Sequence, residues 1–264
     1  MERRNIINWN AFDAVLFDLD GVLTATAKVH ARCWKRMFDE YLSDTVTPAG
    51  SAPRPFVLSD DYAQYVDGKL RYDGVRSFLS SRGIWLPDGM PADPPSTETV
   101  CGLGNRKNIL FSDVLQSEGV EAYPDALVLL RHLREHGVRL AVVSSSRNCE
   151  PILTAAGMAD FFEARVDGLV AEEVGLSGKP SPETFLYAAQ MLDVEPVSTA
   201  VVEDALAGVR AGHEGGFGLV LGIDRTDGER DLKRAGADVV VTDLKTTLMS
   251  DSDALIPSQL RPIK

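Results

Sequence analysis

Two aspartates separated by one residue stand at the end of a short apolar segment near the start of the chain. Residues 14–17 have no polar alternation, as in a strand that is buried on both faces of a parallel sheet, and Asp18 follows directly. Ligands of open α/β sheets bind at such strand ends. In an extended chain Asp18 and Asp20 would point the same way, and Gly21 allows a sharp turn after them. Two carboxylates this close repel each other, and a hard cation such as Mg²⁺ relieves that repulsion with oxygen ligands.

Other interpretations of this aspartate pair exist. An acidic pair after a strand is also common in a solvated turn. An EF-hand calcium loop does not fit, because that loop needs glycine at its sixth position and Gly21 is fourth when counted from Asp18. The pair therefore indicates a functional site only if distant segments supply the missing parts.

Three later segments carry polar side chains at places where such parts would be expected. Serines 144–146 follow a predicted strand, Lys179 precedes a predicted helix, and Glu203 with Asp204 ends another predicted strand. Each segment also has an ordinary interpretation. The serines fit a turn or a helix cap, the lysine fits a solvated surface, and the acidic pair fits a helix N-terminus.

The order of these four segments resembles the haloacid dehalogenase superfamily. The matching motifs are Phe17-Asp18-Leu19-Asp20-Gly21-Val22-Leu23-Thr24, Val142-Val143-Ser144-Ser145-Ser146, Gly178-Lys179-Pro180-Ser181-Pro182 and Val202-Glu203-Asp204-Ala205. The resemblance implies that Asp18 is a nucleophile that forms an acyl phosphate, and that Asp20 exchanges protons with the departing and incoming oxygens. It also implies that Ser144 binds the transferring phosphate and that Lys179 contributes positive charge beside the nucleophile.

The same resemblance implies a Mg²⁺ cofactor. Its ligands would be the Asp18 side chain, the backbone carbonyl of Asp20 and the Asp204 side chain, with Glu203 as a further ligand. Members of the superfamily that cleave carbon–halogen bonds keep the nucleophile but lack the second aspartate. The presence of Asp20 therefore favours phosphoryl transfer.

Within the superfamily the chain is most similar to the β-phosphoglucomutase-like subfamily, over nearly its whole length. That resemblance implies a small phosphorylated sugar as substrate, bound by Thr26, His30, Gly68, Arg71, Lys107, Asn108, Ser145, Ser146, Arg147 and Asn148. A mutase needs a second anion site, because its bisphosphate intermediate rebinds in the opposite orientation. Arg71 can offer a forked donor pair to that anion, and Lys107 can offer charge. Ala25 stands where the subfamily commonly has aspartate, so we expect the hinge to open or close differently.

The segments between the motifs divide into a helical part and an alternating part. The helical part has predicted helices at 28–42, 60–68, 73–82 and late in 98–118, with irregular segments at 48–55 and 85–95. The alternating part has predicted strands at 139–143, 164–166, 199–202, 217–221 and 238–241, and predicted helices from 124 and at 148–156, 182–192 and 229–235. We therefore predict an α/β fold with a doubly wound parallel sheet, formed by residues 1–27 and 118–264, and an inserted α-helical cap domain, residues 28–117.

Composition places the chain among ordinary globular proteins. It has 264 residues, of which 44% are hydrophobic and 25% charged, and a formal net charge of −12, which argues against nucleic acid as a partner. No apolar run approaches the roughly 20 residues that a membrane span needs, and the N-terminus does not have the pattern of a signal peptide. Cys33, Cys101 and Cys149 are too scattered for a disulfide framework. We expect a monomeric cytoplasmic protein without a membrane partner.

Two glycine-rich segments carry no chemistry of their own. Gly102-Leu103-Gly104 begins like a dinucleotide-binding loop, but Lys107 occupies the third glycine position and no strand precedes it. Residues 212–218 lack phosphate-loop spacing, so we predict a turn there, with His213 at the surface.

The predicted reaction is the Mg²⁺-dependent interconversion of β-glucose 1-phosphate and glucose 6-phosphate, through phospho-Asp18 and the 1,6-bisphosphate. One alternative is a sugar-phosphate phosphatase with the same core residues. A phosphatase need not keep His30, Arg71 and Lys107, so their presence argues against this alternative. A second alternative is a non-catalytic phosphosugar-binding module, since a fold alone does not guarantee activity. The retention of both Asp18 and Asp20 counts against that alternative.

Overall fold

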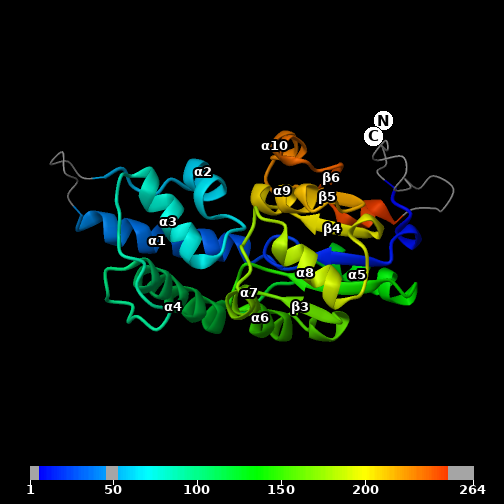
Figure 1. Ribbon diagram of the computed structural model, residues 1–264, viewed down its shortest axis with the longest axis horizontal. Helices are drawn as coiled ribbons and strands as arrows, with labels where there is room; N and C mark the ends of the chain where they lie inside the picture. Colours follow the sequence, from blue (N-terminus) through cyan, green and yellow to red (C-terminus); the bar gives the residue numbers. More distant parts are fainter. Residues whose placement is uncertain (1–5, 46–52, 249–264) are drawn as a thin grey trace. The chain divides into compact units, whose positions relative to one another are not determined.

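A computed structural model describes residues 6–45 and 53–248 (Figure 1). The chain divides into two compact units, one formed by Met1–Ala25 with Glu121–Lys264 and the other by Thr26–Val120. The first unit is called the core and the second the cap. Most of the irregular segment predicted at 48–55 lies outside the described residues.

The described part of the core forms a six-stranded parallel sheet in the order β3-β2-β1-β4-β5-β6. The strands are β1 (Ala14–Phe17), β2 (Arg139–Val143), β3 (Ala164–Val166), β4 (Thr199–Glu203), β5 (Leu219–Ile223) and β6 (Val239–Val241). All four residues of β1 are buried, as expected for a strand with helices on both faces. Because β1 pairs with β2 on one side and β4 on the other, the strand order reverses at β1, which is where doubly wound sheets bind ligands.

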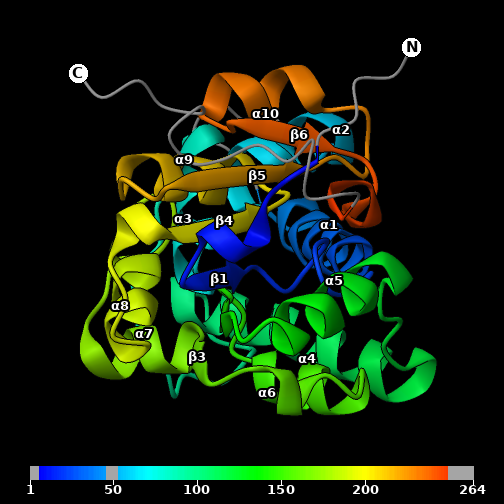
Figure 2. The same ribbon diagram turned by 90° about the vertical axis from the view of Figure 1, so that its right-hand side faces the viewer.

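Helices cover both faces of this sheet (Figure 2). They are α5 (Pro124–Glu135), α6 (Cys149–Ala155), α7 (Gly168–Val174), α8 (Glu183–Met191), α9 (Leu206–Glu214) and α10 (Glu229–Ala235), with short 3₁₀ segments at Trp9–Ala11, Ala159–Phe161, Pro196–Ser198 and Leu244–Thr247. Figure 2 shows α8 and α9 on one face and α5 on the other. The strand order extends from β1 to β2 and β3 on one side and to β4, β5 and β6 on the other. Because the crossovers are right-handed, the connecting helices of the two halves lie on opposite faces of the sheet.

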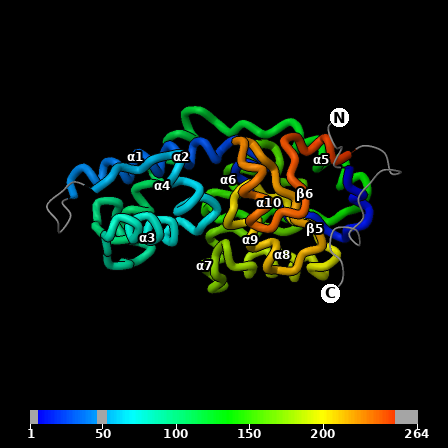
Figure 3. The backbone as a smooth tube through the Cα atoms, turned by 90° about the horizontal axis from the view of Figure 1, so that it is seen from above, coloured from blue at the N-terminus to red at the C-terminus, as the bar shows by residue number. Residues whose placement is uncertain are grey.

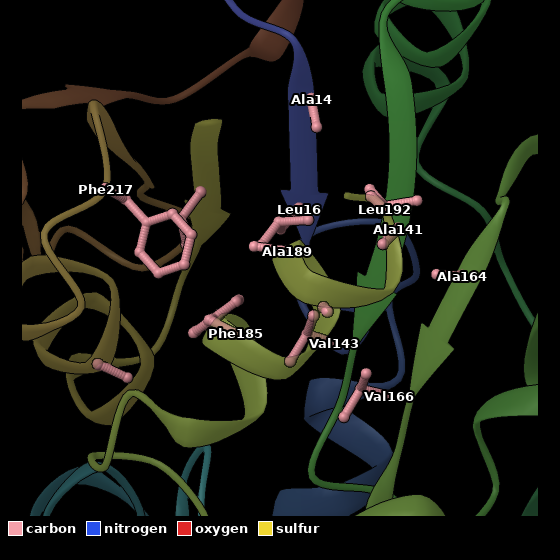
Figure 4. Packing of buried hydrophobic residues seen from close by; sticks show 13 residues of the cluster. Ala14, Leu16, Ala141, Val143, Ala164, Val166, Phe185, Ala189, Leu192 and Phe217 are labelled. Atoms are coloured by element: carbon pink, nitrogen blue, oxygen red, sulfur yellow. The ribbon is translucent and has the colours of Figure 1, made fainter. Parts of the chain in front are cut away.

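The face of the sheet under α8 has an apolar core of small and large side chains (Figure 4). Ala14 and Leu16 of β1 contribute to it beside Val143 of β2, while Phe185 of α8 and Phe217 pack edge to face with ring centroids 6.0 Å apart. Burying a phenylalanine of this kind contributes about 2 kcal/mol. The packing makes β1 a rigid support for the residues at its carboxyl end.

The cap contains α1 (Ala27–Ser43), α2 (Leu58–Asp61), a π-helical segment at Tyr62–Val66, α3 (Arg71–Ser81) and α4 (Val100–Glu118). Within this unit α1 lies against α4, as Figure 3 shows. The helix predicted at 28–42 is α1, and on its buried face Phe38 stacks on Trp34 and Phe56. No strand occurs among the described residues of the cap, so this unit has a helical core of its own.

The structure differs from the sequence expectations at several helices. Helices α7 and α9 were not predicted from the sequence, and the turn predicted at 212–218 is wrong at its start, because Gly212 lies inside α9. A Cβ atom at Gly212 would lie 3.2 Å from Val201 and from Val220, so this glycine lets α9 approach the sheet closely. Gly102 and Gly104 lie inside α4, which agrees with the prediction that this segment is not a dinucleotide-binding loop. His213 is exposed, as predicted.

Candidate active site

The turn after β1 carries the two aspartates. Asp18 continues the ladder of β1 through a bond from its backbone N–H to the carbonyl of Val202 (3.0 Å), and the residue is only 6% exposed. Gly21 adopts a φ of +95°, which an L side chain rarely adopts. A Cβ atom on Gly21 would lie 1.8 Å from Oδ2 of Asp204, so only glycine lets this turn lie against that carboxylate.

Lys179 binds the first of these aspartates. Its Nζ donates to Oδ1 of Asp18 (2.5 Å), to Oε1 of Glu203 (2.7 Å) and to the carbonyl of Val143 (2.9 Å), which uses all three donors of the ammonium. Burial by itself lowers the pKa of Lys179, but the charges of Asp18 and Glu203 outweigh it and raise the pKa above its ordinary value. Lys179 is therefore a permanent cation between two buried carboxylates.

The electrostatics of Asp18 indicate an excess of negative charge. Burial raises the pKa of Asp18 well above its ordinary value; Lys179 opposes this rise, whereas Glu203 and Asp20 add to it. One lysine thus faces several carboxylates. Oxygen atoms of Asp18, Glu203 and Asp204 lie within 4.8 Å of one another, and this is the only group of potential metal ligands found among the described residues. Carboxylate oxygens at this spacing suit a hard divalent cation, which would supply the missing positive charge.

Glu203 occupies a fully buried position behind the site. Besides its contact with Lys179, its Oε2 accepts a bond from the backbone N–H of Ala205 (2.9 Å). Gly208 of α9 leaves the necessary space, since a Cβ there would lie 1.7 Å from Oε1 of Glu203. Both oxygens of Glu203 thus already accept hydrogen bonds, and a role as metal ligand stays a prediction.

This close approach predicts a large effect of Gly208→Ala. The added methyl group would displace the Glu203 carboxylate from Lys179, and we expect a loss of stability of about 1–3 kcal/mol and a loss of most activity. Urea unfolding and turnover assays would measure the two effects. Arg210→Ala, on the exposed face of the same helix, is the control and should leave both unchanged within error. A Gly208→Ala protein with normal stability and turnover would show that the carboxylate has room to move.

The serine run after β2 forms a closed loop that leads into α6. Oγ of Ser144 accepts a bond from the backbone N–H of Ser146 (3.1 Å), and Oγ of Ser146 accepts one from the N–H of Asn148 (3.1 Å). Ser144 also lies beside Asp20, with 3.5 Å between its Oγ and Oδ2. The serines thus form the turn that their alternative interpretation predicted, and they also bring one hydroxyl to the aspartates.

Arg147 leaves this loop toward α7. Its Nη1 is 3.1 Å from a carboxylate oxygen of Glu172, and its backbone and side chain pass close to Gly168. Ser145 and Asn148, which belong to the same loop, are partly buried. The structure therefore places the four predicted contact residues of positions 145–148 on one loop at the carboxyl edge of β2.

The predicted cap residues form two polar pairs within the cap. Nζ of Lys107 lies 2.6 Å from Nδ1 of His30, and it also lies over the rings of Trp34 and Phe111 at 5.0 and 4.8 Å. Because a protonated lysine can only donate, a hydrogen bond from Lys107 requires Nδ1 of His30 to be the acceptor.

In the second pair, Nη2 of Arg71 donates to Oδ1 of Asn108 (2.7 Å). Arg71 is the first residue of α3, and Gly68 shortly before it has a φ of +69°. Thr26 is buried directly before α1, and its carbonyl accepts from the N–H of His30 (2.9 Å). Helix geometry thus places Thr26 and His30 on one turn of the chain.

The sequence motifs that meet at this site match a known family. The family model described as "Hydrolase: haloacid dehalogenase-like hydrolase" matches residues 12–216, which include every core motif discussed above. The chain belongs to this haloacid dehalogenase-like family.

Three proteins similar to this chain are β-phosphoglucomutases. The chain is 49% identical over 238 residues to the β-phosphoglucomutase of Mycobacterium bovis, covering 89% of this chain and 91% of that protein. It is 32% identical over 229 residues to the β-phosphoglucomutase of Bacillus subtilis, covering 86% and 88% of the two chains. The crystal structure of the Clostridium difficile β-phosphoglucomutase aligns with a TM-score of 0.68 at 22% identity, covers 89% of this chain and 92% of that one, and supports the fold. The family model and these relatives support an enzyme of the phosphosugar mutase or phosphatase type.

Some supporting residues of this family member escaped the sequence analysis. Gly208 lies five residues after Glu203 in a segment of small residues. That pattern fits a turn as well as a helix that packs closely against a carboxylate, so the sequence did not distinguish the two. Asp125 and Arg225 lie 100 residues apart and carry no motif, and only the fold brings them together.

In the described part of the chain no helix has both the length and the apolar character to cross a membrane.

Proposed function

We propose that this protein is a Mg²⁺-dependent phosphosugar mutase that interconverts β-glucose 1-phosphate and glucose 6-phosphate. The observation that carries the proposal is the Asp18 carboxylate held on the Lys179 ammonium, with Asp20 and the Ser144 hydroxyl beside it at the switch point of the sheet. The 49% identity to a β-phosphoglucomutase supports the choice of substrate.

In the proposed reaction Asp18 attacks the C1 phosphorus of bound glucose 1,6-bisphosphate. Because Lys179 holds Oδ1, the other carboxylate oxygen of Asp18 forms the new oxygen–phosphorus bond. The bond from phosphorus to the sugar oxygen breaks, and Asp20 gives its proton to that oxygen. Glucose 6-phosphate leaves, and in the second half Asp20 takes a proton from the 6-hydroxyl of an incoming β-glucose 1-phosphate. The phosphoryl group passes from Asp18 to that oxygen, which regenerates the 1,6-bisphosphate.

The residues that would hold Mg²⁺ are Asp18, Asp204 and the backbone carbonyl of Asp20, with Glu203 as a further candidate. Mg²⁺ in this place would neutralise the charge of the phosphoryl group, which otherwise repels an attacking carboxylate. The chain's own part is to keep these oxygens together, and Lys179 does so by binding Asp18 and Glu203 at once.

The cap pairs would bind the parts of the substrate that do not react. With Nδ1 of His30 accepting from Lys107, the Nε2–H of the ring would be a hydrogen-bond donor suited to a hydroxyl or phosphate oxygen. Arg71 would provide a forked donor pair for the second phosphate. Such a second anion site is what a mutase needs and a phosphatase does not.

Phosphorus NMR distinguishes the candidate functions. The purified protein would receive Mg²⁺, β-glucose 1-phosphate and a trace of glucose 1,6-bisphosphate, next to the same sample of Asp18→Asn. A growing glucose 6-phosphate signal, absent in the variant, is the expected result. Release of inorganic phosphate instead would make the protein a phosphatase whose cap admits water. Binding of the sugar phosphates without turnover would indicate the non-catalytic module.

Arg71→Lys tests the second anion site. Loss of the forked donor pair should raise the KM for glucose 1,6-bisphosphate about ten- to a hundredfold, because a hydrogen bond between charged groups contributes about 1.5–3 kcal/mol. Phosphorylation of Asp18 by a small donor such as acetyl phosphate should stay unchanged. Arg36→Lys, on the exposed side of α1, is the control. An unaltered KM in Arg71→Lys would remove Arg71 from the proposed site.

A further inference from the structure

Arg225 follows β5 by two residues and turns its side chain into the core. Its guanidinium forms a forked pair with Asp125, with Nη1 3.0 Å from Oδ2 and Nη2 3.1 Å from Oδ1. The side chains are 17% and 7% exposed, so the pair is largely removed from water. Asp125 also accepts a bond from the backbone N–H of Leu244 (2.9 Å). A forked pair of this kind fixes the plane of the guanidinium as well as its position.

Nη1 of Arg225 also lies 3.3 Å from the carbonyl oxygen of Thr242, after β6, and two further contacts point to the turn after β1. Its Nε lies 3.4 Å from the carbonyl oxygen of Gly21, and its guanidinium carbon lies 4.0 Å from the ring centre of Tyr123. The backbone N–H of Tyr123 donates in turn to the carbonyl of Leu23 (2.9 Å). Arg225 thus contacts the beginning of the turn directly and its end through Tyr123.

Hydrogen bonds fix the orientation of the peptide groups on both sides of Gly21. The N–H of Gly21 donates to the carbonyl of Thr24 (2.8 Å), and its own carbonyl accepts from Arg225. Because a peptide unit is planar and trans, the bond made by the Gly21 N–H also sets the opposite direction of the Asp20 carbonyl. A glycine with a φ of +95° has no side chain to resist rotation, so these two bonds decide its conformation.

The Gly21 turn also sets the space around Asp204. The Cα of Gly21 lies so close to that side chain that a Cβ would be 1.8 Å from Oδ2. A small rotation at Gly21 therefore moves the Asp20 carbonyl and at the same time changes the room left for the Asp204 carboxylate. Both groups belong to the ligand set of the proposed cation site.

We infer that Arg225, held by Asp125, is a positioning residue that orients the Gly21 turn for binding of the divalent cation. The inference rests on the proposed function, because it assigns the cation to Asp18, Asp20 and Asp204. Lysine does not replace arginine here, since a single ammonium cannot hold both oxygens of Asp125 and reach the Gly21 carbonyl in a fixed plane.

The test measures cation binding without substrate. Mn²⁺, whose free ion gives a resolved paramagnetic resonance signal, is titrated into the full chain. The variants are Arg225→Lys and the double variant Arg225→Gln/Asp125→Asn, which leaves no unpaired buried charge and so protects the fold. Arg234→Gln removes an exposed arginine that pairs with Asp231 on α10, and it serves as the matched control. Circular dichroism and cooperative thermal unfolding establish that each protein is folded.

The expected result is an increase of about tenfold in the Mn²⁺ Kd of both Arg225 variants, as for other residues that orient metal ligands, with no change in Arg234→Gln. In addition, kcat at saturating Mg²⁺ should remain within about threefold of the wild type while the Mg²⁺ concentration needed for half activity rises in the same proportion. A folded double variant with the wild-type Mn²⁺ Kd would overturn the inference and leave the proposed function intact. A wild-type protein that binds no Mn²⁺ would overturn the cation site of the proposed function, and the inference with it.

Discussion

Asp18→Asn is expected to reduce turnover by more than about a thousandfold, because the amide cannot form the acyl phosphate through which the proposed reaction proceeds. The variant should remain folded. Burial raises the pKa of Asp18 well above its ordinary value, which means that the charged carboxylate is unfavourable at this position in the absence of a cation. A neutral amide of the same shape removes the repulsion with Glu203 and Asp20, so the midpoint of thermal unfolding without Mg²⁺ should be equal to or above that of the wild type.

The measurement combines phosphorus NMR for turnover with a thermal scan of each protein. Asp13→Asn is the matched control, since Asp13 is an exposed aspartate at the opposite end of the same strand. It should leave turnover unchanged. Substantial turnover by Asp18→Asn would exclude a phospho-Asp18 intermediate, whereas loss of turnover in both variants would indicate damage to β1 and not to the chemistry.

Lys179→Met is expected to have the largest effect on stability. Removing the ammonium leaves the buried carboxylates of Asp18 and Glu203 without their shared partner, and breaking a buried pair in this way costs about 3–5 kcal/mol. Turnover should also fall by about a thousandfold or more, because the nucleophile loses the contact that orients it. Urea unfolding at neutral pH measures the first effect, and phosphorus NMR the second.

A second variant separates these two effects. Lys179→Met/Glu203→Gln removes one of the two unpaired charges, and we expect it to recover about half of the lost stability while turnover stays absent. Lys245→Met is the control, because Lys245 makes an exposed pair with Asp243, and such pairs contribute little. A Lys179→Met protein with wild-type stability would contradict the buried ion pair, and recovery of turnover in the double variant would contradict the role of Lys179 at the nucleophile.

The same lysine explains how the core tolerates so many carboxylates. Asp18 and Glu203 come from the carboxyl ends of adjacent strands, β1 and β4, and parallel pairing forces them close together. Lys179 compensates part of this charge through its contacts with both carboxylates, and oxygen atoms of Asp18, Glu203 and Asp204 lie within 4.8 Å of one another. A divalent cation in the proposed site would offset the excess negative charge that remains.

The sequence by itself determined the parts of this protein that depend on local pattern. The uninterrupted apolar run 14–17 predicted a buried strand, because four residues are enough for a strand and too few for a buried helix. The sharp change to Asp18 predicted the functional end of that strand. The alternation after residue 123 predicted the parallel sheet, and the order of the motifs identified the family. These features are read from neighbouring residues, so they need no knowledge of distant contacts.

The tertiary structure alone decided which of those residues meet and what supports them. Gly208 and Gly212 weaken the helical pattern of α9, and the helix forms nonetheless because their missing side chains admit the Glu203 carboxylate and the sheet. The pair of Asp125 and Arg225 joins positions a hundred residues apart, and no local signal marks either one. Close approach and long-range pairing are properties of the folded packing, and a single sequence carries no periodicity that records them.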